Sequence, residues 1–208
     1  MTAAAVTVFL VDDDAGVLKG LSRLLRAHGS EAQAFTSAKE FLASHDNSIP
    51  GCAVLDVSMP DLDGLELQES LTAENSQRPV VFLTGKGDIP TSVRAMRAGA
   101  IDFLTKPVSE ADLMTAIARA VRVDSESRQL SSELESINAR FARLTPRERE
   151  VMTHVIAGRL NKQIAGDLGT VEKTIKVHRG RVMEKMCVRS VADLVRLAER
   201  AGIAPQKP

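Results

Sequence analysis

The chain has 208 residues, of which 44 % are hydrophobic and 26 % are charged, so it fits one large or two small globular domains and excludes a disordered or fibrous protein. The early apolar stretch "AAAVTVFLV" has no basic residue before it and is too short to span a membrane, so we expect a cytoplasmic protein with no membrane partner. The formal net charge is zero, but the charges are unevenly distributed. Residues 1–123 have 11 basic and 16 acidic residues, residues 124–143 have 3 and 4, and residues 144–208 have 13 and 7. This distribution predicts an acidic domain, a linker and a basic domain.

Short apolar runs alternate with helical spacing through residues 1–123. The runs predicted to be strands are 6–11, 32–35, 52–57, 79–84 and 100–105. Between them, apolar residues recur at helical intervals, as at Val17, Leu21, Leu24 and Leu25. Five strands that alternate with helices predict a parallel sheet covered on both faces.

Polar residues follow the predicted strands at their carboxyl ends, where open α/β sheets carry their chemistry. Asp12 and Asp13 follow the first run, Asp56 lies in the third, Thr84 closes the fourth and Lys106 follows the fifth. Carboxylates, a hydroxyl and a lysine at one edge suit a hard cation and a phosphoryl group. We therefore expect Mg²⁺, with Asp56 as the nucleophile and Lys106 and Thr84 contacting phosphoryl oxygens.

Asp14 has a different predicted role from its two acidic neighbours, because it precedes a helix expected to begin at Ala15. There it would cap the helix. The two cysteines, Cys52 and Cys187, lie far apart and form no C-x-x-C pattern. We expect both to be free thiols that serve in packing.

A heptad-like stripe crosses residues 124–143, where neither Pro nor Gly occurs. Its members are Leu130, Leu134, Ile137, Phe141 and Leu144. Two heptads leave two interpretations open, a short coiled coil or an amphipathic linker helix packed on its own domains. Either one predicts a helical linker, continuous with a helix that starts near Ser109.

In the basic region, residues 144–208, the start and stop signals predict four helices. Thr145, Pro146 and Glu148 form a helix-start signature, and Gly158 stops that helix. The later helices are expected in "NKQIAGDLG", "VEKTIKVHRGRVMEKM" and "SVADLVRLAERAG". A short helix, a tight turn at residues 168–170 and a basic helix predict a helix-turn-helix that binds duplex DNA.

Residues 1 to about 123 resemble the receiver domain of two-component response regulators, with the flavodoxin-like or CheY-like fold. The match rests on Asp12 and Asp13, Asp56, Thr84, and Lys106 with Pro107; "LTGKGDIPTSVRAMRAGAIDFLTKP" is similar to the FixJ branch of the FixJ/NarL family. The resemblance implies Mg²⁺ ligation by Asp13, Asp56 and the main-chain carbonyl of Ser58, with Asp12 holding the metal through water or orienting it. It also implies a cis bond between Lys106 and Pro107, and Phe103 as the aromatic residue that follows phosphorylation.

Residues 144–208 resemble the LuxR-type helix-turn-helix, through "LTPRERE", "NKQIAGDLG" and "KTIKVHRGRVMEKM". The helix over 171–186 has an apolar stripe of Ile175, Val182 and Met186. By this resemblance, Lys176 and Val177 face base edges. The other candidate DNA-binding residues, some of which contact phosphates or close the interface, are Asn161, Lys173, Thr174, Arg179, Arg181 and Lys185.

Two positions depart from the LuxR-type pattern. Val171 stands where a capping serine is common, so Thr170 is an alternative cap that would shift the helix start by one residue. Cys187 stands where a glycine often ends the helix. Since cysteine adopts a left-handed conformation at a higher cost than glycine, we expect the helix to end differently.

The sequence therefore predicts a phosphorylation-switched transcription regulator. Its expected partners are a sensor histidine kinase, double-stranded promoter DNA, RNA polymerase and, when phosphorylated, a second copy of itself. One alternative is a magnesium phosphatase or phosphotransferase, disfavoured because Ser58 stands where that class places a second aspartate. The other is a regulator that binds a diffusible ligand in its N-terminal domain.

Overall fold

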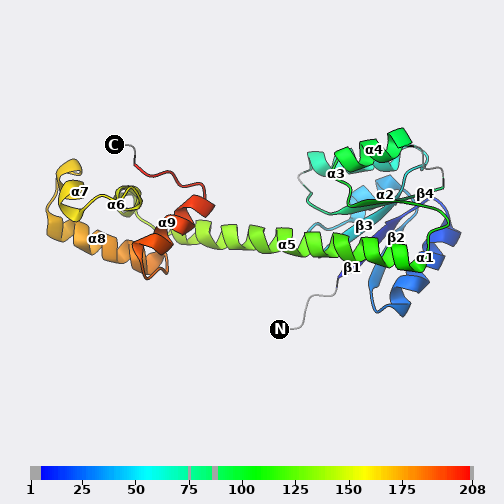
Figure 1. The fold of residues 1–208 in the computed structure, drawn as a ribbon, viewed down its shortest axis with the longest axis horizontal. Helices are drawn as coiled ribbons and strands as arrows, with labels where there is room; N and C mark the ends of the chain where they lie inside the picture. The colour runs from blue at the N-terminus through cyan, green and yellow to red at the C-terminus, as the bar shows by residue number, and fades with distance from the viewer. Residues whose placement is uncertain (1–5, 75, 86–88, 207–208) are drawn as a thin grey trace. The chain divides into compact units, whose positions relative to one another are not determined.

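The chain folds into two compact units, residues 1–128 and 129–208. The computed structural model describes residues 6–74, 76–85 and 89–206 (Figure 1). The boundary between the units falls within helix α5 (Glu110–Ala142). Over the described ranges, no helix is both long enough and apolar enough to cross a membrane.

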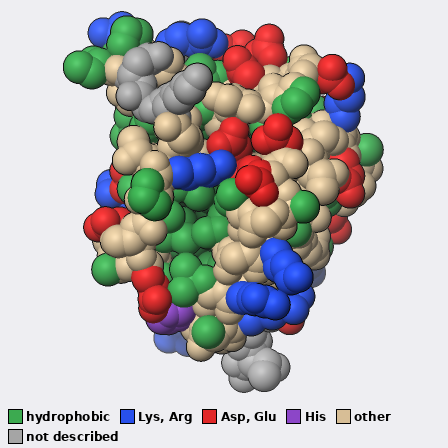
Figure 2. All heavy atoms as spheres, turned by 90° about the vertical axis from the view of Figure 1, so that its right-hand side faces the viewer, with side chains coloured by type: hydrophobic (Ala, Val, Ile, Leu, Met, Phe, Trp, Pro, Cys, Tyr) green, Lys and Arg blue, Asp and Glu red, His purple; other side chains and the backbone are tan. Residues whose placement is uncertain are grey.

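The first unit is built on a five-stranded parallel sheet, as predicted. Its strands lie in the order β2-β1-β3-β4-β5. Their bounds are β1 Thr7–Val11, β2 Glu31–Phe35, β3 Gly51–Asp56, β4 Val80–Thr84 and β5 Asp102–Thr105. The covering helices are α1 Ala15–Ala27, α2 Ala38–Ser44, α3 Gly64–Ala73, α4 Ile89–Arg97 and the first part of α5. Figure 2 looks onto the carboxyl edge of the sheet, where acidic and basic side chains lie close together.

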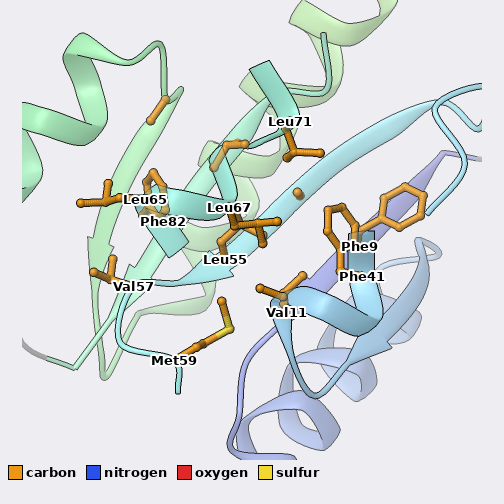
Figure 3. Packing of buried hydrophobic residues seen from close by; sticks show 14 of the residues in the cluster. Phe9, Val11, Phe41, Leu55, Val57, Met59, Leu65, Leu67, Leu71 and Phe82 are labelled. Carbon is orange, nitrogen blue, oxygen red and sulfur yellow. The ribbon is translucent and has the colours of Figure 1, made fainter. Parts of the chain in front are cut away.

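Hydrophobic clusters cover both faces of the sheet, because alternate residues of each buried strand point to opposite sides. In β1, Phe9 and Val11 join one cluster, shown in Figure 3, with the α3 residues Leu67 and Leu71. Val8, also in β1, joins the other cluster, against α1 and α5. Burial on both faces explains why the three central strands β1, β3 and β4 are largely apolar runs, whereas the edge strands β2 and β5 carry polar residues.

Helix α5 is continuous from Glu110 to Ala142, which confirms the predicted junction of the last receiver helix with the linker. The heptad-like stripe divides along it. Ile137, together with Leu144 just beyond the helix, is buried in the core of the second unit, whereas Leu130 and Leu134 are 62 % and 40 % exposed. Packing of the linker stripe on its own domain is therefore confirmed only for its second half.

The second unit completes its core with four short helices, as predicted. They are α6 Pro146–Ile156, α7 Asn161–Asp167, α8 Glu172–Lys185 and α9 Val191–Arg200. The Thr145 hydroxyl accepts from the Glu148 N–H, and the Glu148 carboxylate accepts from the Thr145 N–H, so the predicted capping box is confirmed. Gly158 follows α6 with a φ of 77°, which confirms the predicted stop.

The ends of α8 correct two expectations. Val171 is the N-cap and its side chain makes no capping bond, so the alternative start at Thr170 is wrong. Cys187 adopts the left-handed conformation, with a φ of 55°, at a cost of about 1–2 kcal/mol. Its N–H donates to the Glu184 carbonyl and the Val188 N–H to that of Met183, which is the usual glycine-type ending. The helix therefore ends as it would with glycine at this position, although cysteine adopts this conformation at a higher cost.

The two cysteines are free, as predicted, but only one serves in packing. Cys52 is fully buried in β3, and burial raises the pKa of its thiol to about 12. Cys187 is exposed and follows α8 in the left-handed conformation. The packing role predicted for Cys187 is wrong.

Candidate functional site

Three predicted site residues meet at the carboxyl edge of the sheet. Asp12 follows β1, Asp56 ends β3 and Lys106 follows β5. The Lys106 Nζ donates to Asp12 Oδ2 at 2.6 Å and to Asp56 Oδ1 at 2.7 Å. Both carboxylates are buried, while 23 % of the Lys106 side chain is exposed. The strand order thus brings together residues separated by up to 94 positions in the chain.

The electrostatics of this cluster favour a charged lysine. Partial burial alone would lower the pKa of Lys106, but the hydrogen bonds to Asp12 and Asp56 and the attraction of their charges outweigh it and raise the pKa. Lys106 therefore stays protonated at neutral pH. Its ammonium compensates the repulsion between two buried carboxylates that lie on neighbouring strands.

Backbone N–H groups fix the other oxygens of the two carboxylates. Asp12 Oδ1 accepts from the Asp14 N–H at 3.0 Å, and Asp56 Oδ2 accepts from the Ser58 N–H at 2.6 Å. Asp14 itself caps α1, as predicted, by accepting from the Gly16 and Val17 N–H groups. Each buried carboxylate is thus held at both oxygens, which fixes its orientation.

Asp13 is exposed at the mouth of the cluster, and no hydrogen bond or ion pair joins its side chain to any residue in 6–74, 76–85 or 89–206. Ser58 is also exposed; its N–H faces Asp56. Asp13 is therefore the solvated carboxylate next to the pair that Lys106 bridges.

Thr84, Phe103 and Pro107 complete the set of predicted receiver residues. Thr84 is fully buried at the end of β4, and its carbonyl accepts from the Lys106 N–H at 2.7 Å. Phe103 is half-buried on β5, with its ring centroid 6.1 Å from that of Phe82. The bond between Lys106 and Pro107 is cis, as the resemblance implied.

The donor chemistry of the cluster fits a hard divalent cation, because Asp12, Asp13, Asp56 and the Ser58 carbonyl offer only oxygen atoms. In the part of the chain that the structure describes, no three His, Cys, Asp or Glu side chains are already arranged around a common metal position. Asp12 and Asp56 are paired with Lys106. Each of these carboxylates has further lone pairs, so a cation at this pair would share the carboxylates with the Lys106 ammonium.

Gly64 is a positioning residue that the sequence reasoning missed. A Cβ at this position would lie 2.2 Å from the Asp56 carbonyl oxygen, so only glycine lets the start of α3 approach the end of β3 so closely. Its N–H donates to the Val57 carbonyl at 3.0 Å. The signal was present in "DLDG", because glycine after an acidic helix cap often marks close backbone approach.

The second candidate site is the helix-turn-helix formed by α7, a turn with Gly169 at a φ of 60°, and α8. Ile175, Val182 and Met186 are fully buried, which confirms the predicted apolar stripe. The opposite face presents the exposed residues Lys173, Lys176, Val177 and Arg181. Val177 is 49 % exposed although it is apolar, which suits a contact with a base edge.

The remaining candidate DNA-binding residues are engaged within the unit. Arg179 donates to Asn161 Oδ1 at 3.2 Å, which links α8 to the start of α7. Thr174 is half-buried in the first turn of α8. Lys185 donates to the buried Glu148 Oε2 at 2.6 Å, so its ammonium joins α8 to α6.

We expect the pair of Glu148 and Lys185 to make the stability of the second unit depend on pH. The hydrogen bonds from Lys185 and from the Thr145 N–H hold the pKa of Glu148 below its usual 4.5. The pair therefore stabilises the fold fully above that value, and its contribution is lost as the pH falls through the lowered pKa. Glu148→Gln should lower the free energy of unfolding at pH 7 by about 1–3 kcal/mol, and by less at acidic pH.

Hydrogen exchange of the α6 and α8 amides in the full chain measures this difference. Glu150→Gln is the matched control, because Glu150 lies on the same helix but is half-exposed and pairs only with Arg147. If Glu148→Gln lowers the free energy of unfolding equally at pH 7 and at acidic pH, the pair of Glu148 and Lys185 is not the source of the pH dependence.

Comparison with known proteins assigns each of the two units to a family. The family described as "Response regulator receiver domain" matches residues 8–118, and the family described as "Bacterial regulatory proteins, luxR family" matches residues 142–198. Nodulation protein W of Bradyrhizobium diazoefficiens is 44 % identical over 95 % of this chain and 87 % of its own length. Transcriptional regulatory protein FixJ of the same species is 41 % identical over 94 % of this chain and 96 % of its own length.

Among solved structures, that of the response regulator StyR is 48 % identical, covers 95 % of this chain and all of its own, and superposes with a TM-score of 0.88. A receiver fold with a lysine-bridged carboxylate pair, joined to a LuxR-type helix-turn-helix, defines a DNA-binding response regulator. The chain belongs to the FixJ/NarL family of two-component response regulators and is similar to its FixJ branch.

Proposed function

We propose that this response regulator accepts a phosphoryl group on Asp56 from a sensor histidine kinase in the cytoplasm and, as a phosphorylation-promoted dimer, binds duplex DNA to control transcription. The observation that carries the proposal is the contact of Lys106 with both Asp12 and Asp56 at the carboxyl edge of the sheet. This contact supports the proposal, because a cation beside Asp56 would stabilise the negative charge of a phosphoryl group bound there.

In the proposed reaction, an Asp56 oxygen attacks the phosphorus of the donor, and the bond from phosphorus to the leaving group breaks. Lys106 remains charged and pairs with a phosphoryl oxygen, while the Thr84 hydroxyl donates to another. Asp12, Asp13, Asp56 and the Ser58 carbonyl would hold Mg²⁺, which neutralises charge on the phosphoryl group. We propose no turnover of external substrates, only slow loss of the phosphoryl group.

We propose that the dimer forms through α4 and β5, the face that also contains Arg94, Arg97, Ala98 and Phe103. Three apolar side chains of α4 support this surface. Ile89, Val93 and Met96 are 80 %, 43 % and 46 % exposed and recur at intervals of four and three, so they lie on one side of the helix. The exposed Leu130 and Leu134 of α5 are the alternative dimer surface.

For transcription, we propose that residues 124–143 serve as the linker between domains 1–123 and 144–208, and that the DNA-bound dimer acts on RNA polymerase. The exposed face of α8 would enter the major groove, with Lys176 and Val177 at base edges. Asn161, Lys173, Thr174, Arg179, Arg181 and Lys185 would contact phosphates or support the reading residues.

Two substitutions in α8 test this division of roles. Lys176→Ala should cost about 1–3 kcal/mol on the specific site and relax sequence preference, because it removes a base contact. Arg179→Ala should weaken binding to all sequences alike and reduce the log–log salt slope by about 0.9, because it removes a phosphate contact. Titration of both variants against operator and random duplexes at several salt concentrations separates the two roles. An unchanged specificity ratio for Lys176→Ala would refute its role in base recognition.

A further inference from the structure

A pocket of about 430 Å³ opens on the second unit where α8 ends. Its walls are the last part of α5, the turn between α8 and α9, and α9 itself. Four arginines contribute to the lining, Arg140, Arg189, Arg196 and Arg200, against one carboxylate, Asp193. The volume is that of a site for a small organic ligand, and the excess of guanidinium groups indicates an anion.

Two of these arginines already have acidic partners. Arg196 pairs with Asp193 at 2.6 Å, and Arg200 pairs with Glu133 on α5. The Asp193 carboxylate also accepts from the Ser190 hydroxyl at the start of α9. Within each pair the two charges cancel. Asp193 is the one acidic residue of the pocket lining, so none is left there for Arg140 and Arg189.

Arg140 and Arg189 therefore carry the uncompensated charge. Among the described residues, the Arg140 guanidinium makes only long bonds to neutral acceptors, 3.4 Å to the Met186 carbonyl and 3.3 Å to the Ser136 hydroxyl. Arg189 is exposed and has no hydrogen bond or ion pair with any residue that the structure describes. A guanidinium group binds a carboxylate through two parallel hydrogen bonds, so each arginine can hold one carboxylate.

The pocket also has an apolar part, formed by Val188 and Leu197. A ligand that carries only charge would leave these side chains against water, whereas a hydrocarbon body would cover them. None of the residues proposed above for DNA contact lines the pocket. We infer that this pocket is a binding site for a small organic dicarboxylate, with one carboxylate on Arg140, the other on Arg189, and the carbon skeleton against Val188 and Leu197.

Cys187 supplies a reporter for occupancy, because it lines the pocket and is the exposed cysteine, whereas Cys52 is fully buried. The experiment measures the rate of alkylation of Cys187 by iodoacetamide, a neutral reagent, in the full chain at constant ionic strength. Phthalate is the probe, since it has two carboxylates on one ring; benzoate has one. We expect phthalate to protect Cys187 in a saturable manner, at concentrations about tenfold lower than benzoate.

Arg189→Gln should weaken protection by phthalate about tenfold, to the level of benzoate. The matched control is Arg143→Gln, which removes an exposed arginine of the same unit that lies outside the pocket lining; it should leave protection unchanged. Equal protection by phthalate and benzoate, or an equal effect of both variants, would overturn the proposal. Protection by duplex DNA with none by phthalate would overturn it too, by identifying Arg189 as a contact for DNA phosphates.

Discussion

Asp56→Asn is expected to abolish magnesium-dependent, acid-labile phosphorylation of the chain by acetyl phosphate. The amide keeps the shape of the side chain but lacks the carboxylate oxygen that attacks phosphorus. It also removes the charge that Lys106 contacts at 2.7 Å. Radiolabel incorporation into the purified full chain measures the effect, which should be a complete loss because Asp56 is the proposed acceptor.

Asp61→Asn is the matched control, since Asp61 lies in the loop after β3 but is exposed and pairs with Lys39. It should be labelled like the wild type.

Lys106→Ala should still accept the phosphoryl group, because the nucleophile remains, but more slowly. Its phosphorylation should raise transcriptional output only weakly. Labelling of Asp56→Asn at the wild-type level would show that another residue is the acceptor, and full transcriptional output from Lys106→Ala would remove its proposed role in the switch.

Much of the fold could be predicted from local pattern, because the buried strands read as apolar runs and several helices, such as α1 and α6, begin at a side-chain cap. The sheet edge illustrates this: once five parallel strands are assigned, Asp12, Asp56 and Lys106 lie at the same edge, and the strand order then brings them into contact. The same reasoning located the capping box of α6 at Thr145 and Glu148. These features depend on short-range physics or on topology alone.

What could not be predicted depends on contacts between distant residues. Leu130 and Leu134 have the same spacing as Ile137, yet only Ile137 reaches a core, because the helical unit covers just the end of α5. Lys185 looked like one more basic residue of a DNA-binding helix, but the buried Glu148 engages it. The left-handed Cys187 was missed because propensity disfavours it, and the packing of Val182 and Met186 overrides a cost of about 1–2 kcal/mol.

The second large effect that we expect is a gain in DNA affinity on phosphorylation, on the order of 100-fold, for a duplex with two half-sites. A single helix-turn-helix makes few base contacts and binds weakly. Pairing through α4 and β5 makes the second contact effectively intramolecular, so affinity rises without any new contact to DNA. Half-site centres should lie about 10 base pairs apart, one helical turn, so that both α8 helices meet the major groove on the same side.

Titration of phosphorylated and unphosphorylated chain against one half-site, two half-sites, and two half-sites shifted by about five base pairs measures the gain. It should appear only for the aligned pair. Val93→Glu places a charge in the exposed apolar stripe of α4 and should remove the gain without changing single-site affinity. Leu134→Glu places the same charge in the exposed part of α5 and should retain the gain in affinity. If Leu134→Glu removes the gain and Val93→Glu does not, the dimer forms through the linker helix, and the receiver face is not the surface that phosphorylation controls.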